Sequence, residues 1–431
     1  MRILHTSDWH LGRYLEQISR LDEQKEFIDF LCKTVEEQNI DLVLIAGDIY
    51  DTYNPPAAAE ELFYDALDRL NAKGKRAVVV IAGNHDNPDR LCAASPIALR
   101  NGIIMLGYPS SDAGTHNIPG NSINVVASGM GWIELSISGC EHNAVILTLP
   151  YPSEARLEEV LSEEADEAIL QQAYSGKIGN LFARLSEKFR DDTVNLGISH
   201  MFLLGGKSSD SERTLQVGGA LTVDPAVLPE KAHFMAFGHL HRPQRIKGAL
   251  CPAYYSGSPL AYSFSEADYN KCVFIIDALP GKPADISELA LDCGRPLCRW
   301  KAQGLEQAMQ WCEEGRDSDA WIDLEIRTDR VLTQEEQKKL RELNPGIINI
   351  RPLIVTEAET EDIFENRENK KIDQLFKDYF RCRTGTDIPD ELMNLFIDIA
   401  FSQDTDESKG AGRTVTDEDS SGGEAIETAV S

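Results

Sequence analysis

The sequence predicts an α/β domain over residues 1–280, followed by a small α+β domain and C-terminal helices. Two observations support this fold class. Short apolar runs of strand length alternate with amphipathic segments through the first hundred residues, and further apolar runs recur as far as residue 277. The length of 431 residues also exceeds what one ordinary hydrophobic core supports. Strands that alternate with helices indicate a mostly parallel sheet with helices on its faces.

The first hundred residues predict a β-α-β-α-β unit. The apolar runs have strand length, and the segments between them place their apolar side chains on one helical face. In order, the predicted strands and helices are Arg2–Thr6, Ser19–Gln38, Leu42–Ala46, Ala57–Leu70 and Ala77–Ala82. This order implies that the two helices lie on the faces of the sheet.

Further strands are predicted up to residue 280, together with one long helical segment. The helical segment, Glu154–Leu185, is rich in Glu and is predicted to be exposed. The predicted strands are Asn124–Ala127, Ile133–Ser138, Ala144–Leu149, Val194–Ser199, Phe234–Phe237 and Lys271–Asp277. The last of these strands is expected to close the first domain.

Residues 281–356 differ in character and predict a small α+β capping domain. A strand at Trp321–Ile326, a helix at Thr333–Leu343 and a strand at Ile347–Ile350 support this interpretation. The next segment, residues 357–402, contains two stretches whose apolar side chains recur at i, i+3, i+4 and i+7, so two amphipathic helices are predicted there.

The composition is that of a globular protein with an acidic end. Residues 403–431 are mostly Asp, Glu, Ser, Thr and Gly, and are predicted to be disordered.

No apolar run approaches the length of a membrane span and the N-terminus lacks a secretory signal, so a cytoplasmic location is expected. The nine cysteines lack metal-binding spacing and are expected to be free thiols.

The formal charge of −29 is an objection to a nucleic-acid substrate, because proteins that bind DNA by themselves normally present a basic face. The charge alone favours a small anionic substrate, or an acidic surface that serves solubility. Bound metal ions, or a partner subunit that contacts the DNA, would weaken the objection.

Seven side chains that can bind metal follow five of the apolar runs. Each comes at or just after the carboxyl end of a predicted strand, where ligands bind in sheets of this kind. The seven are Asp8, His10, Asp48, Asn84, His200, His239 and His241. Any one of these motifs alone is more often a turn or a satisfied histidine than a metal ligand, but a chance coincidence of all five is very unlikely.

These seven ligands suffice for two metal ions that share one carboxylate. The expected partition is Asp8, His10 and His241 on one ion, Asn84, His200 and His239 on the other, and Asp48 as the bridge. Carboxylate, imidazole and amide ligands suit Mn²⁺, Fe²⁺ or Zn²⁺. Two such ions can activate water and clamp a phosphate during in-line attack, which predicts hydrolysis of a phosphate ester. His85 is expected to be the general acid, or a donor to the phosphoryl oxygens.

The same motifs resemble those of the calcineurin-like metallophosphoesterase superfamily. The shared blocks are Asp8-x-His10, Gly47-Asp48, Gly83-Asn84-His85-Asp86, His200 and Gly238-His239-x-His241. The resemblance implies a four-layer sandwich of α/β type. It leaves the substrate open, because the superfamily includes protein phosphatases, nucleotidases and cyclic-nucleotide phosphodiesterases.

Four longer segments resemble the SbcD family of bacterial nuclease subunits. They are MRILHTSDWHLGR, AGDIYDTYNPP, GGKSSDSER and YYSGSPLAYSFSE, and the resemblance is looser beyond residue 280. It implies a Mn²⁺-dependent DNA nuclease with 3′→5′ exonuclease action on duplex ends and endonuclease action on single strands and hairpins. It also implies a homodimer that acts in DNA recombination, repair and replication with the coiled-coil ATPase SbcC, bound through residues 357–402.

Asp51 departs from the pattern of this family. Archaeal and eukaryotic relatives carry a histidine three residues after the bridging aspartate, where this chain has Asp51. Asp51 is expected either to orient His85 through its carboxylate or to be a simple turn residue.

Two further sets of residues have two interpretations each. Arg13, Arg20 and Arg90 lie near the motif loops and either contact DNA phosphates or are ordinary surface charges. The segment Ser258–Tyr262 either contacts DNA or supports the histidines of the GHLH motif from behind.

Two other functions compete with that of a DNA nuclease. A phosphoesterase acting on small-molecule or protein phosphates would suit the acidic composition. A scaffold that binds DNA ends without chemistry would be expected to have lost ligands, whereas all seven are present here.

Overall fold

The computed structural model describes residues 1–118, 120–157, 167–212 and 221–354, with the short stretches 376–377, 388–389 and 392–393. Met1–Ile354 form one compact unit. Apart from those short stretches, the helices predicted within 357–402 lie outside the described residues, as does the tail predicted at 403–431. No helix within the described ranges is long and apolar enough to cross a membrane.

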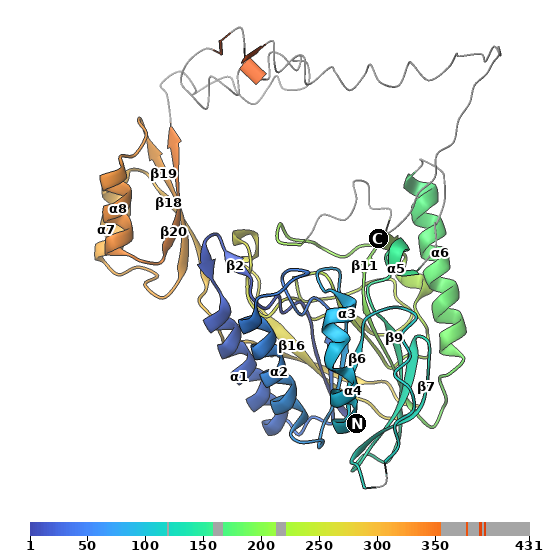
Figure 1. Cartoon of the computed structure of the whole chain (residues 1–431). Helices are drawn as coiled ribbons and strands as arrows, with labels where there is room; N and C mark the ends of the chain where they lie inside the picture. Colours follow the sequence, from blue (N-terminus) through green and yellow to red (C-terminus); the bar gives the residue numbers. More distant parts are fainter. Residues whose placement is uncertain are drawn as a thin grey trace, which may run out of the picture. The chain divides into compact units, whose positions relative to one another are not determined.

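A six-stranded sheet contains the predicted β-α-β-α-β unit (Figure 1). Its strands are, in order across the sheet, β17 (Asp285–Ala290), β16 (Cys272–Asp277), β1 (Arg2–Thr6), β4 (Leu42–Ala46), β5 (Ala77–Ile81) and β6 (Ile103–Leu106). The last four are parallel, and β16 and β17 are added antiparallel at one edge. The predicted parallel unit is therefore confirmed.

A seven-stranded sheet follows. Its strands are, in order, β14 (Gln244–Arg245), β15 (Ala253–Tyr255), β13 (Phe234–Gly238), β10 (Val194–His200), β9 (Ala144–Leu149), β8 (Trp132–Ile137) and β7 (Ile123–Gly129). The four central strands β15, β13, β10 and β9 are parallel, whereas the strands outside them pair antiparallel. Two parallel segments, one in each sheet, therefore present carboxyl strand ends.

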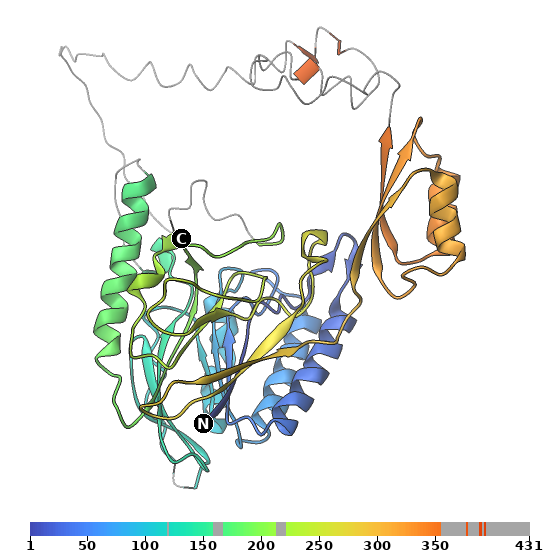
Figure 2. The same cartoon turned by 180° about the vertical axis from the view of Figure 1, so that it is seen from behind.

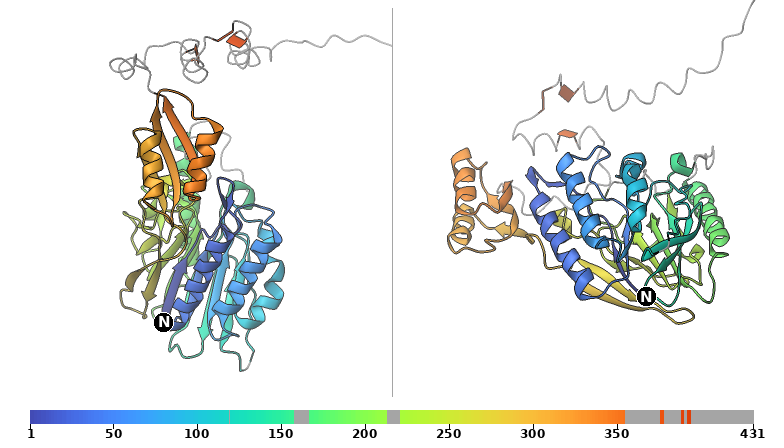
Figure 3. Two further views of the ribbon diagram at one scale, coloured as in Figure 1. Left: turned by 90° about the vertical axis from the view of Figure 1, so that its left-hand side faces the viewer. Right: turned by 60° about the horizontal axis from the view of Figure 1, so that its bottom comes forward.

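The two sheets pack face to face, with helices on both outer faces (Figures 1 and 3). Apolar side chains from both sheets, such as Leu44 and Phe234, form the core between them. Helices α1 (Leu21–Glu37) and α2 (Ala57–Asn71) cover the first sheet, and α6 (Glu167–Ser186) packs on the second. The expected four-layer arrangement is confirmed.

The described parts of Glu154–Leu185 are helical as predicted, but the prediction that the segment is exposed is wrong for one face of its second helix. The described parts of this segment are α5 (Glu154–Leu157) and α6, and residues 158–166 lie outside the described residues. Tyr174, Ile178 and Phe182 recur every four residues along α6 and are buried against the second sheet. The many acidic residues of the segment concealed this apolar stripe.

Short elements complete the first 280 residues. The short strands are β2 (Tyr14–Leu15), β3 (Ile18–Ser19), β11 (Phe202–Leu203) and β12 (Thr222–Val223). The short helices are α3 (Pro88–Leu91) and α4 (Ser95–Ala98), with single 3₁₀ turns at Cys92–Ala94, Leu99–Asn101, Pro225–Val227 and Phe264–Glu266.

A separate three-stranded sheet forms the predicted small domain (Figure 2). Its strands are β18 (Leu297–Ala302), β19 (Trp321–Thr328) and β20 (Ile347–Ile354), all parallel, and its helices are α7 (Leu305–Glu313) and α8 (Gln334–Leu343). A capping box between Thr333 and Glu336 defines the start of α8. The indole of Trp321 donates a hydrogen bond of 2.9 Å to Glu23 of α1, which attaches this domain to the first one.

The hairpin of β16 and β17 shows that the first sheet continues to Ala290. The sequence does not predict β17, because its side chains are exposed or half-buried and contain only a short alternation of apolar and polar residues. The predicted boundary at residue 280 falls within this hairpin, and the three-stranded sheet begins at Leu297.

His5 on β1 predicts acid sensitivity of the fold. Its ring lies between Phe234 and Phe274, and burial lowers its pKa to about 3. The unfolded chain binds a proton near pH 6.5 and the folded chain does not, so the free energy of unfolding should fall by about 1.4 kcal/mol per pH unit between pH 6.5 and 3. We expect His5→Phe to make the pH dependence of the free energy of unfolding, measured in urea titrations, less steep by about this amount, and equal slopes for both proteins would contradict the assignment.

Candidate metal centre

All seven predicted ligands lie at one place, where carboxyl strand ends of both sheets meet. Asp8, His10, Asp48 and Asn84 follow β1, β4 and β5 of the first sheet. His200 is the last residue of β10, and His239 and His241 follow β13 of the second sheet. The sequence predicts that these side chains lie together at the carboxyl ends of strands, and in the structure those strands belong to two different sheets. Asn84 is half-buried and the other six side chains are buried.

The first group of side chains contains Asp8, His10 and His241. One ligand atom from each lies within 4.8 Å of the others. The Nε2 atoms of His10 and His241 are 3.0 Å apart. Two ligands about 2.1 Å from one ion, at about a right angle, are about 3 Å apart, so this spacing fits a shared ion.

The second group contains Asn84, His200 and His239. Asn84 Oδ1 is 2.9 Å from His200 Nε2 and 2.9 Å from His239 Nδ1. Asp48 lies between the groups: its Oδ2 atom is 3.7 Å from His10 Nε2 and 3.5 Å from His200 Nε2. The described residues therefore form two sets of ligand atoms with one carboxylate between them.

Hydrogen bonds behind the rings determine which nitrogens face the cluster. The Nδ1 atoms of His200 and His85 lie 2.8 Å and 2.7 Å from the backbone oxygens of Ala46 and Asp51. A carbonyl oxygen only accepts hydrogen bonds, so both Nδ1 atoms carry hydrogen and both Nε2 atoms face inward. His200 Nε2 thus meets Asn84 Oδ1, an acceptor, with Asp48 nearby. A positive charge, either a proton or a cation, must lie among these atoms.

The charges of the cluster agree with this conclusion. Burial would lower the pKa of His200, but the Asp48 carboxylate outweighs burial and raises it to about 9. Burial would raise the pKa of Asp48, but His200 and His85 hold it well below its usual range. Burial also raises the pKa of Asp8 to about 6. Cations that bind here must therefore displace protons.

His10 provides a second test of the fit to a metal ion. Its Nδ1 atom is buried and has no hydrogen-bond partner among the described residues, while the Asp51 carboxylate lies 3.6 Å away. If Nε2 bound a cation, Nδ1 would carry the hydrogen and would face that carboxylate. The donor set and this unsatisfied atom both fit a divalent metal.

Four of the seven residues have left-handed backbone conformations. The φ angles are 54° at Asp8, 47° at His10, 50° at Asp48 and 108° at His239. Such conformations cost about 1–3 kcal/mol each for residues other than glycine, and they concentrate at functional sites. The fold therefore maintains strained loops where these side chains converge.

Asp51 contacts His85 in a way that the sequence does not predict. Its backbone oxygen, not its carboxylate, accepts the hydrogen of His85 Nδ1. The carboxylate instead accepts a hydrogen bond of 3.2 Å from Arg13 and lies beside His10. The backbone oxygen of Asp51 thus fixes the His85 ring, while its carboxylate lies 3.6 Å from His10 Nδ1.

The three arginines near the motif loops all have partners within the protein. Arg20 is fully buried and pairs with Glu23, so both interpretations of Arg20 are wrong. Arg13 pairs with Asp51, and Arg90 forms a more exposed pair with Glu60. These pairs occupy the guanidinium groups with carboxylates of the same chain.

The segment Ser258–Tyr262 lies behind the histidines. Ser258 is fully buried. The ring of Tyr262 packs edge-on against His10 and His241, with centroids 5.6 Å and 6.1 Å away. Its hydroxyl donates to the backbone oxygen of Trp9. These contacts agree with the supporting role among the two interpretations of the segment.

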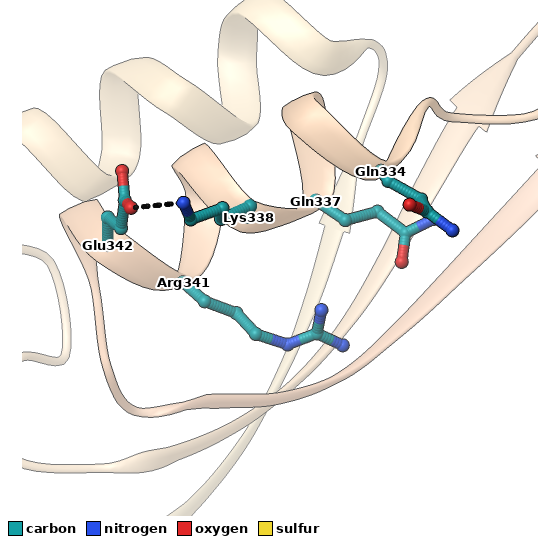
Figure 4. Close-up of a pocket in the computed structure, with 5 residues that line it drawn as sticks. All are labelled: Gln334, Gln337, Lys338, Arg341 and Glu342. Atoms are coloured by element: carbon teal, nitrogen blue, oxygen red, sulfur yellow. Dashed lines mark ion pairs between the residues drawn. The ribbon is translucent and has the colours of Figure 1, made fainter.

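A surface hollow beside α8 differs chemically from this cluster (Figure 4). It has a volume of about 360 Å³ and is lined by Gln334, Gln337, Lys338, Arg341 and Glu342. Lys338 and Glu342 form an ion pair of 3.6 Å within the helix. The lining residues include no histidine and no buried carboxylate, so the hollow offers no comparable site.

Comparisons with known families agree with the geometry. The model of the calcineurin-like phosphoesterase family matches residues 1–243. The model of a second family, described as the type 5 capsule protein repressor C-terminal domain, matches residues 293–384. The first match contains all seven residues of the cluster, and the second includes the three-stranded sheet.

Similar curated proteins share most of their length with this chain. The SbcD subunit of the SbcCD nuclease of Bacillus subtilis is 46% identical over 411 residues, which cover 95% of this chain and 100% of that protein. The SbcD protein of Rhodobacter capsulatus is 29% identical, with coverages of 84% and 88%. That of Escherichia coli K12 is 27% identical, with coverages of 80% and 83%.

Proposed function

Because the chain belongs to the SbcD nuclease subunits within the calcineurin-like phosphoesterases, we propose that it cleaves DNA together with a coiled-coil ATPase of the SbcC type. As a member of this family it is a metal-dependent phosphodiesterase. The proposed reactions are 3′→5′ exonuclease action on duplex ends and endonuclease action on single strands and hairpins. The observation that carries the proposal is the double set of ligand atoms around Asp48.

The cofactor is proposed to be a pair of Mn²⁺ ions. One would be held by Asp8, His10 and His241, the other by Asn84, His200 and His239, with Asp48 shared. When bound, the two ions would supply positive charge to the phosphate oxygens and activate a water molecule. The mixture of carboxylate, amide and imidazole ligands is compatible with Mn²⁺, and the resemblance to the SbcD family favours it over Fe²⁺ and Zn²⁺.

His85 is proposed to hold the proton that the leaving oxygen receives. Its Nδ1–H is fixed by the backbone oxygen of Asp51, so Nε2 points toward the cluster, 3.9 Å from Asp48 Oδ2. Its backbone N–H donates to Asp48 Oδ1 at 2.9 Å, which fixes its place relative to the shared carboxylate. Asp51 is proposed to orient His85 through its backbone carbonyl group.

Each part of the chain has a proposed role. Residues 1–280 would contain the nuclease chemistry, with β17 completing their first sheet, and 281–356 would form the capping domain. Residues 357–402 would bind the ATPase, and 403–431 would be an acidic tail. We further propose that the protein is a cytoplasmic homodimer and that the ATPase contributes DNA contacts, which would reconcile a DNA substrate with the net charge of −29.

A second candidate function is hydrolysis of small-molecule or protein phosphates, and the same net charge favours it. Purified protein with Mn²⁺ should be assayed on hairpin DNA, alone and with the ATPase, and on a generic phosphomonoester. Cleavage of the DNA with little action on the monoester is the expected result. Hydrolysis of the monoester alone, even with the ATPase present, would refute the nuclease function.

Replacing His85 by Ala should separate metal binding from proton transfer. We expect DNA cleavage to fall by about 10²- to 10⁴-fold, the usual effect of a positioned acid or base. Mn²⁺ affinity should change little, because His85 belongs to neither set of proposed ligands. Isothermal titration with Mn²⁺ and a hairpin cleavage assay measure the two effects. Full activity in the variant would show that another group supplies the proton.

A further inference from the structure

A buried chain of polar side chains lies behind His241, on the side away from the ligand cluster. His241 Nδ1 is 2.5 Å from the hydroxyl oxygen of Ser211, and that hydroxyl also contacts the carboxylate of Glu266. Glu266 in turn forms an ion pair with Lys271. Each of these four side chains is at most 9% exposed, so solvent has little access to their contacts.

One arrangement of hydrogens satisfies the whole chain. Lys271 Nζ donates to Glu266, to His241 O at 3.0 Å and to Ser258 Oγ at 2.8 Å, which uses its three hydrogens. The Lys271 ammonium contacts the Glu266 carboxylate directly, so Glu266 is the acceptor in this ion pair. Glu266 can therefore only accept, so the Ser211 hydroxyl must donate to it.

The direction of this chain determines the state of His241. Because the Ser211 hydrogen is directed at Glu266, the serine oxygen has only lone pairs left for His241 Nδ1. His241 must then carry a hydrogen on Nδ1, and in the neutral ring this leaves a lone pair on Nε2. That Nε2 atom lies 3.0 Å from His10 Nε2, within the first group of ligand atoms.

We propose that Ser211, Glu266 and Lys271 are positioning residues that hold His241 as a ligand for a divalent cation. The proposal rests on the proposed metal site and assigns a role to residues that touch neither substrate nor metal. The proposal makes residues 209–212 part of the support of the metal centre. Ser211 can contact His241 only while these residues keep their position.

Residues 209–212 make further contacts near two of the first group of ligands, His10 and His241. The carboxylate of Glu212 accepts a hydrogen bond of 2.8 Å from the backbone N–H of His241. Arg13 donates to the backbone oxygen of Ser211 at 2.9 Å and to Asp51 at 3.2 Å. Because the Asp51 carboxylate lies beside His10, Arg13 joins the groups behind His10 to those behind His241.

Stability alone does not explain this arrangement. Moving two charges out of water costs several kcal/mol each, and buried ion pairs are often no more stabilising than apolar side chains of similar volume. Glu266 is fully inaccessible and Lys271 nearly so. Groups that fix the ring of a metal-bound histidine, by contrast, typically change metal affinity or activity by about 10- to 100-fold when removed.

The test compares Ser211→Ala with Ser211→Thr in the full chain. The first variant removes the hydroxyl but leaves Glu266 and Lys271 paired, and the second retains a hydroxyl. Ser175→Ala is the matched control, because the buried Ser175 hydroxyl accepts a hydrogen bond of 2.9 Å from Asp224 N on the outer face of the second sheet. Mn²⁺ binding is measured by electron paramagnetic resonance, and thermal unfolding without metal reports on folding.

We expect Ser211→Ala to weaken the binding of one of two Mn²⁺ ions by about 10- to 100-fold, whereas Ser211→Thr and Ser175→Ala bind both ions like the wild type. Wild-type affinity in Ser211→Ala, or an equal loss in Ser211→Thr with unchanged unfolding, would overturn the positioning role while leaving the proposed function intact. A wild-type chain that takes up no Mn²⁺ would overturn the proposed function itself, and the positioning role with it.

Discussion

Asp48→Asn is expected to weaken Mn²⁺ binding by more than about 100-fold and to reduce DNA cleavage by at least as much. Removing a group that only supports a ligand typically costs about 10- to 100-fold. Asp48 lies between both sets of ligand atoms, at 3.7 Å and 3.5 Å from their histidines, so the loss should exceed that range. The substitution preserves shape, and an amide oxygen can still accept from the backbone N–H of His85. The effect should therefore come from the lost charge.

The matched control is Asp323→Asn in the small domain. Asp323 is also a buried carboxylate, paired there with Arg351. We expect this variant to bind Mn²⁺ and to cleave hairpin DNA like the wild type. Isothermal titration and a cleavage assay measure both proteins. Two Mn²⁺ ions bound at wild-type affinity in Asp48→Asn would show that this carboxylate is not shared between them.

Gly238→Ala is expected to reduce the free energy of unfolding by about 3 kcal/mol or more. A Cβ atom at this position would lie 1.9 Å from the backbone oxygen of Ala46 and 2.8 Å from His200 Nδ1. Overpacking usually costs about 1–3 kcal/mol, and here the obstructing atom belongs to the backbone of the neighbouring sheet and cannot rotate away. The same Ala46 oxygen accepts the hydrogen of His200, so metal binding should weaken as well.

Gly176→Ala provides the contrasting case. Gly176 lies inside α6, and a Cβ there would meet no atom within 4 Å. Alanine in a helix interior is favoured over glycine by about 0.5–1 kcal/mol, so this variant should be slightly more stable than the wild type. Urea unfolding measures both effects. A Gly238→Ala protein with wild-type stability would show that the two sheets can separate at this point without cost.

Much of the fold and of the ligand cluster could be predicted because both depend on local patterns. Strands β4 and β5 of the first sheet are continuous apolar runs, and the ligands come at or shortly after the ends of such strands. What the sequence does not reveal is which sheet a strand joins. Strands β10 and β13 are buried along their whole length like β4, yet they belong to a second sheet whose strand ends meet the first.

The residues that support the ligands could not be predicted from the sequence, for a different reason. Glu266 and Lys271 have charged side chains that normally indicate a surface, and only the surrounding fold shows them to be buried. Asp51 was singled out for its carboxylate, but its backbone oxygen makes the contact to His85. The type of a residue does not indicate which contacts its backbone atoms make, so a sequence motif cannot predict such contacts.

The meeting of two sheets at the metal centre has a consequence for protein synthesis. His10 and His241 are 231 positions apart in the chain, yet their ring nitrogens are neighbours. A growing polypeptide holds an incomplete set of ligands until translation has passed residue 241. The enzyme therefore cannot become an active nuclease on the ribosome before most of its first 280 residues have been synthesised.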